Sequence, residues 1–174
     1  MNVVQELAAR TLLVILAAAV VQDFMDMKIS NRLILMGILF SLAFGLTTGG
    51  PKQVIYVLAN LSFPVIVLYL LYLLGVLGAG DIKLFSIIGG FTNFRLLISC
   101  MFFSFVAAAV IAVCKMLYNR NFCGSLLRAG TYFRCLRQEG IVSYHKEWAE
   151  HRNLMHFSVA ILIGYIAAVA VPVL

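Results

Sequence analysis

Long apolar runs, separated by short polar or glycine-rich segments, dominate the pattern of the chain. A helix needs about 20 apolar residues to cross about 30 Å of hydrocarbon, and fewer where the bilayer thins. Six runs are candidates for such spans, and they cover residues 7–21, 33–46, 54–77, 82–91, 96–117 and 154–173. The pattern therefore predicts an all-α integral membrane protein, a bundle of about six transmembrane helices.

Two of the intervening segments carry further information. Thr47-Thr48-Gly49-Gly50-Pro51 signals a turn after the second run. Residues 118–152 form the only substantial polar stretch, and we expect a basic cytoplasmic loop of partial helix there, between the fifth and sixth spans. The fourth run, 82–91, is short. It either crosses the membrane or enters it part of the way, which would leave five spans and require surrounding protein to satisfy its backbone.

Composition indicates a single membrane domain over residues 1–174. Hydrophobic residues make up 63% of the chain and charged residues 11%, with a mean hydropathy of +1.03. These values are far from those of soluble domains. The four cysteines show no C-x-x-C spacing, so free thiols are expected rather than a zinc site. No metal and no cofactor are expected.

Basic residues set the expected orientation. The net charge is +6, but Lys and Arg cluster in loops, which is typical of topology signals and of contact with anionic lipid rather than of nucleic-acid binding. With six spans, one side carries Lys28, Arg32, Lys83, Lys115, Arg120, Arg128, Arg134, Arg137, Lys146 and Arg152, and the other carries Arg10, Lys52 and Arg95. The richer side is expected to be cytoplasmic, with both termini extracytoplasmic.

Two aspartates lie at the boundaries of apolar runs. Asp23 follows the first run, and Asp81 precedes the fourth, directly after Gly78-Ala79-Gly80. An Asp near the bilayer centre costs roughly 2.5–3.5 kcal/mol, so intramembrane acids are functional candidates. Helix count and charge bias put both acids on the cytoplasmic side. Two neighbouring carboxyl groups share one proton near neutral pH, so one can activate a water molecule while the other protonates a carbonyl.

The residues around Asp81 have structural interpretations as well. Gly78 and Gly80 allow positive φ and the close approach of a substrate strand. Asp81 could instead be the N-cap of the fourth span. Lys83 does not face Asp81 on an ideal helix, and we expect it to extend toward the cytoplasmic interface.

The earlier acidic segment holds two candidates. Asp23 lies nearer the membrane, and Asp26 follows one turn later, where position alone favours a solvated loop acid. Ser30 or Asn31 is expected to cap the second span.

These segments carry a family resemblance. Gly78-Ala79-Gly80-Asp81-Ile82-Lys83-Leu84 resembles the GxGDxKL signature of type IV prepilin peptidases, which are aspartyl membrane proteases of the GxGD type. The earlier segment is similar to their D-x6-P-N motif. Asp23 matches its aspartate, Asn31 matches its asparagine, and Ser30 stands where proline is usual. This match selects Asp23 over Asp26.

The resemblance implies a membrane aspartyl endopeptidase that removes the short basic leader from pilin-like precursors at the cytoplasmic membrane face. It implies two catalytic residues, Asp23 and Asp81. The implied site-shaping or substrate-binding residues are Gly78, Gly80, Lys83 and Asn31. The segment 156–164 is similar to the small, apolar start of the family's last helix, again without its frequent proline.

The chain resembles the short form of the family, similar to peptidases of tight-adherence pilus systems and to archaeal preflagellin peptidases. It has no cysteine-rich insert with paired C-x-x-C motifs, so methyltransferase activity is not expected. The implied partners are a prepilin-like membrane protein and the lipid bilayer of the inner or plasma membrane.

Two other functions are compatible with the same acids. A small ion- or proton-coupled transporter would use them to bind cations. Their position at one face rather than mid-span, and the lack of an evident inverted repeat, are unfavourable to this alternative. A non-catalytic membrane scaffold would tolerate replacement of both acids.

Overall fold

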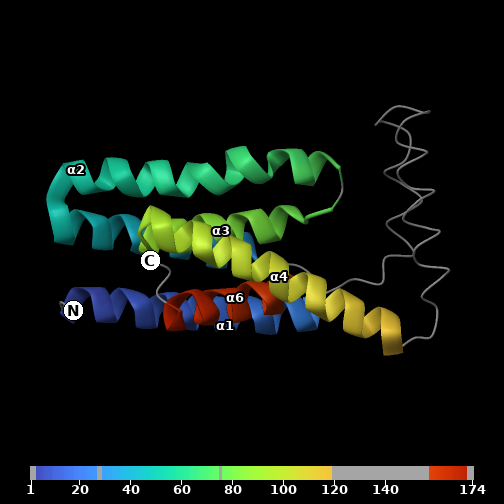
Figure 1. Ribbon diagram of the computed structural model, residues 1–174. Coiled ribbons are helices and arrows are strands. Elements are labelled where there is room, and N and C mark those ends of the chain that lie inside the picture. Colours follow the sequence, from blue (N-terminus) through green and yellow to red (C-terminus); the bar gives the residue numbers. More distant parts are fainter. Residues whose placement is uncertain (1–2, 27–28, 75, 119–156, 172–174) are drawn as a thin grey trace. The chain divides into compact units, whose positions relative to one another are not determined.

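The structure is a computed structural model that describes residues 3–26, 29–74, 76–118 and 157–171. These residues form the helices shown in Figure 1: α1 (Val3–Asp26), α2 (Asn31–Leu73), α3 (Ala79–Phe91), α4 (Phe94–Tyr118) and α6 (Phe157–Ala170). The described ranges contain no strand, and the fold is all-helical. By length and composition, α1, α2 and α4 can each cross a membrane, and α6 is a shorter apolar helix.

Helix α2 turns back on itself. A straight helix of its 43 residues would be about 65 Å long, roughly twice the hydrocarbon thickness of a bilayer. Gly50 alone within α2 has non-helical dihedrals, φ 65° and ψ −155°, and Pro51 follows it. Figure 1 shows two antiparallel arms, residues 31–49 and 51–73, on either side of this bend. The turn that the sequence predicts near Gly50 is confirmed.

Helix α3 packs closely against both arms of α2. A Cβ atom built on Gly89 would lie 2.5 Å from the carbonyl oxygen of Asn60, in the second arm. One built on Gly90 would lie 2.6 Å from Oγ of Ser41, in the first arm. The Asn60 side-chain amide also donates to the carbonyl of Thr92 at 3.2 Å. Glycines permit this close contact, as small residues do between membrane helices.

Tertiary contacts group the chain into two units. The first unit comprises Met1–Ala108 and His156–Leu174, and the second comprises Ala109–Met155. Within the first unit, α1 contacts α2, α3 and α6, and α3 contacts α6. Its core is formed by buried apolar side chains from all five described helices, among them Leu12, Leu68, Phe85, Leu97 and Ile161. In the second unit, the structure describes the C-terminal part of α4. The single domain over residues 1–174 stays a prediction.

The observed helix ends correct the predicted runs in two places. Helix α3 begins at Ala79 rather than at residue 82, because its first turn includes the glycine segment. Helix α2 ends at Leu73 rather than at residue 77, and it joins the second and third runs into one element. The number of membrane crossings therefore stays a prediction. Residues 119–152 of the predicted loop lie outside the described part of the chain.

Candidate functional site

Four segments of the first unit meet at one of its ends. They are the end of α1, the start of α2, the start of α3 and the start of α6 (Figure 1). Asp23 lies in the last turn of α1, and Asp81 lies in the first turn of α3. Both side chains are partly buried. The structure thus places the two candidate acids at the same end of the helices, although 57 residues of chain lie between them.

Asp81 takes part in starting α3. The backbone N–H of Gly78, the N-cap residue, donates to Oδ2 of Asp81 at 3.1 Å. Asp81 is therefore the third residue of the helix, with its carboxylate capping the N–H of Gly78, rather than the N-cap itself, which corrects the structural alternative for this residue. The positive end of the helix dipole also interacts favourably with an ionised Asp81. Its side chain is held by the backbone that surrounds it.

The carboxylate of Asp23 is bonded to a different helix. The hydroxyl of Ser158, in the first turn of α6, donates to Oδ2 of Asp23 at 2.5 Å. Ser158 is buried, with 1% of its surface exposed. This bond links the first turn of α6 directly to the last turn of α1. The position of Asp23 therefore depends on how α6 docks against α1.

The connection between α1 and α2 joins the two acidic segments. The backbone N–H of Ser30 donates to Oε1 of Gln22 at 3.0 Å, which ties the start of α2 to the end of α1. Ser30 is the N-cap of α2 and accepts from the N–H of Arg32 at 3.3 Å, as one of the two sequence-based alternatives predicts. Lys83 then reaches across from α3 and donates to Oδ1 of Asn31 at 2.9 Å. Two of the predicted site residues, Lys83 and Asn31, are thereby in direct contact.

The two glycines beside Asp81 differ from expectation. Gly78 has φ −79° and Gly80 lies inside α3, whereas Gly50 is the described glycine with positive φ. Positive φ at Gly78 and Gly80 is therefore a wrong prediction. Close approach is observed instead: a Cβ on Gly80 would lie 3.2 Å from Cδ1 of Ile29. Gly80 lets the connection between α1 and α2 pack against the turn that holds Asp81.

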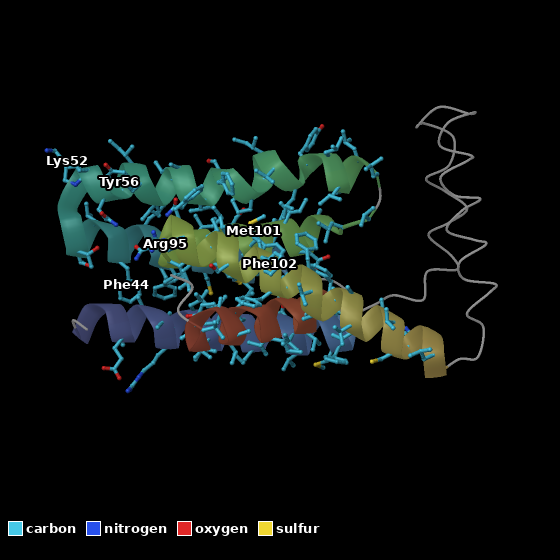
Figure 2. All side chains as sticks on the ribbon, viewed as in Figure 1. Phe44, Lys52, Tyr56, Arg95, Met101 and Phe102 are labelled. Atoms are coloured by element: carbon cyan, nitrogen blue, oxygen red, sulfur yellow. The ribbon has the colours of Figure 1, made fainter. Side chains whose placement is uncertain are left out.

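Basic side chains lie at both ends of the first unit. Arg32 and Lys83 are exposed at the end that carries the acids. Figure 2 shows Lys52 and Arg95 at the opposite end, where α2 folds back and α4 begins. This division agrees with the charge pattern from which the orientation is predicted, and the orientation itself stays a prediction.

Among the described residues, this end carries the carboxyl groups of the two candidate acids, serine hydroxyls, side-chain amides and the basic groups of Arg32 and Lys83. In the described ranges, no three His, Cys, Asp or Glu side chains are grouped so that they could hold a metal ion. Two partly buried carboxyl groups at the ends of apolar helices can supply a general base and a general acid. Asp26, by contrast, is exposed at the last residue of α1.

Sequence reasoning assigned no role to two residues that hold the site together, Gln22 and Ser158. A signal for Ser158 exists, because it is a polar residue at the start of an otherwise apolar helix. Its partner, however, lies 135 residues away along the chain, and the sequence pattern does not indicate which helix α6 meets.

A comparison with protein families completes the description. A family model described as the type IV leader peptidase family matches residues 11–113, which is more than half of the chain. The chain belongs to this family of membrane peptidases, as the two motifs indicated. The matched region includes both acids and ends before α6. No curated protein and no solved structure gave a significant match.

Proposed function

We propose that the chain is an aspartic-type endopeptidase that removes the short leader of pilin-like precursors at the cytoplasmic face of the membrane. Membership of a family of leader peptidases supports peptide-bond hydrolysis and a pilin-like precursor as the substrate. The observation that carries the aspartic mechanism is the position of the acids. Asp23 and Asp81 lie at one end of the same unit, on helices α1 and α3, which contact one another.

In this mechanism one acid acts as the general base and the other as the general acid. One carboxylate accepts a proton from water as the water attacks the scissile carbonyl, and the other carboxyl group donates a proton to the developing oxyanion. The tetrahedral intermediate then collapses as the C–N bond breaks: the first acid gives its proton to the leaving amine nitrogen, and the second takes its proton back from the hydroxyl as the carbonyl re-forms. Either acid can serve as the base while the other serves as the acid. No metal, nucleophilic serine or cofactor is needed for these steps.

The position of the site favours a substrate that is itself a membrane helix. The acids lie at the ends of apolar helices rather than at their middle. A precursor helix in the bilayer would present the residues just outside its apolar segment at this level. Exposed Lys83, which donates to Asn31, lies two residues after Asp81 near the start of α3 and is a candidate contact for the polar backbone of the substrate.

The experiment is cleavage of a prepilin-like probe, a short basic leader ahead of an apolar helix of about 20 residues. Asp23→Asn and Asp81→Asn are each expected to lower the cleavage rate by at least about 100-fold, because general acid–base catalysis contributes at least that much. The matched control is Asp26→Asn, which changes an exposed acid one turn after Asp23 and is expected to cleave as the wild type does. Retained cleavage in either catalytic variant, with the protein still in the membrane, would refute the assignment.

The transporter alternative makes a different prediction. It requires ion movement into liposomes that contain the purified protein and no cleavage of the probe. Both acids lie in the end turns of their helices, and this position is more suitable for hydrolysis at the membrane boundary than for binding a cation mid-span.

A further inference from the structure

One buried hydroxyl differs from the others in what it bonds. The described part of the chain has four buried serines, Ser41, Ser86, Ser104 and Ser158. The hydroxyls of the first three donate to backbone carbonyls three or four residues earlier in their own helices. This is the usual way in which a helical serine satisfies its hydroxyl inside a membrane protein. Ser158 instead donates to the side chain of Asp23 on another helix, at 2.5 Å.

The start of α6 is held firmly enough to act as a support for Asp23. Phe157 packs against Phe85 of α3, with ring centroids 6.2 Å apart, and against Phe105 of α4, with centroids 5.8 Å apart. Further along α6, a Cβ on Gly164 would lie only 2.5 Å from the backbone nitrogen of Ser104, so α6 and α4 are in close contact there. Both contacts lie within the first unit.

The same aromatic contact relates the two acids. Phe85 is fully buried and follows Asp81 by four residues, which is about one turn of α3. Phe157 precedes Ser158 directly in α6. Because Phe85 and Phe157 pack together, the turn that carries Asp81 and the hydroxyl that holds Asp23 are fixed against one another. The Ser158 hydroxyl therefore restricts the orientation of the Asp23 carboxylate relative to the turn that holds Asp81.

We propose that Ser158 is a positioning residue for catalysis, and that its hydroxyl holds the Asp23 carboxylate in the orientation needed to activate water. This inference depends on the proposed function. The family match covers residues 11–113, so it assigns no role to Ser158. A residue that acts by orienting a catalytic group affects kcat more than KM, because the substrate binds equally well to a misplaced carboxylate. A merely structural hydroxyl would affect stability and leave kcat unchanged.

The test measures kcat and KM for the prepilin-like probe with the full-length chain in detergent. Ser158→Ala is expected to lower kcat by about 10- to 100-fold, since a misplacement of about 1 Å in a catalytic group has effects of this size. KM is expected to stay within about twofold, because uniform binding is unchanged. Ser158→Thr keeps the hydroxyl and is expected to retain most of kcat.

Two further variants make the result decisive. Ser104→Ala removes an equally buried hydroxyl beside α6 and is expected to keep the wild-type kcat. Ser158→Cys nearly keeps the volume of the side chain but has only a weak donor, so it tests the hydroxyl even if the alanine variant fails to fold. It is expected to lower kcat, as Ser158→Ala is.

The outcomes separate this inference from the proposed function. No cleavage by the wild type, or full cleavage by Asp23→Asn, would overturn the proposed function. Cleavage that is lost in Asp23→Asn but kept in full by Ser158→Ala or Ser158→Cys would overturn the role of Ser158 alone. Equal losses in Ser158→Thr and Ser158→Ala, or in Ser104→Ala and Ser158→Ala, would also overturn that role, because helix packing rather than the hydroxyl would then be responsible.

Discussion

Substitution of Gly90 by alanine tests how α3 is seated against the first arm of α2. The added Cβ would lie 2.6 Å from Oγ and 2.8 Å from Cβ of Ser41, while the next atom, Cδ1 of Leu61, is 3.4 Å away. Only Ser41 therefore stands in the way. Favourable contact between carbon atoms needs about 3.5 Å, so the two helices would have to separate by about 0.7–0.9 Å.

The size of the effect follows from two opposing contributions. Overpacking in a well-packed interface costs about 1–3 kcal/mol. Replacing a helical glycine by alanine gains about 1 kcal/mol. Gly90→Ala is therefore expected to lower the free energy of unfolding by up to about 2 kcal/mol in the wild-type background. In a Ser41→Gly background the obstructing atoms are absent, and the same substitution is expected to raise that free energy by about 1 kcal/mol.

The assay is equilibrium unfolding in mixed detergent micelles, followed by circular dichroism, for the four proteins of the double-mutant cycle. A change of sign between the two backgrounds corresponds to a coupling energy of about 1–3 kcal/mol. Gly89→Ala is the control, because its Cβ would meet the backbone oxygen of Asn60 at 2.5 Å. Substitution of Ser41 cannot relieve that contact. Additive effects of Gly90→Ala and Ser41→Gly would show that the packing of α3 is described wrongly.

Three further predictions concern other parts of the first unit. Gly50→Ala and Gly50→Asn should both lower the free energy of unfolding by about 1–3 kcal/mol, because φ 65° with ψ −155° is accessible essentially to glycine alone; an asparagine variant as stable as the wild type would contradict this. Lys83→Met removes an exposed bond to Asn31 and should change the free energy of unfolding in detergent by less than about 1 kcal/mol. A large loss of cleavage would then reflect contact with substrate, whereas a large loss of stability would refute the reasoning. Gly164→Ala would bring a Cβ to 2.5 Å from the backbone nitrogen of Ser104 and should lower both unfolding temperature and cleavage rate by displacing α6; wild-type values of both would refute the α4–α6 contact.

The helices themselves were largely predictable, because their signals are local. The break near Gly50 is confirmed, since a glycine–proline pair is unsuited to a continuous helix in any context. The start of α3 was placed three residues too late. The start of the helix depends on the Asp81 side chain accepting from the N–H of Gly78, and the hydrophobic pattern does not show this bond.

The candidate site divides in the same way. The motifs selected the two acids, Lys83 and Asn31 individually, and the structure adds that Lys83 and Asn31 are in contact. The prediction of positive φ at Gly78 and Gly80 was wrong. The GxGD spacing indicates that small residues are required, but not whether positive φ or close packing is the reason. Ile29 packing against Gly80 supplies that reason.

The sequence by itself determined that the chain is helical and apolar, where its helices are interrupted, and which acids lie at those interruptions. Only the tertiary structure decided which helix faces meet. Large apolar side chains such as Phe102 and Ile66 remain exposed, as membrane-spanning helices allow, so hydrophobicity does not distinguish a face that packs from one that does not. The contact between Ser158 and Asp23 arises from that packing alone, and it is the feature of the site that no local pattern in the sequence contains.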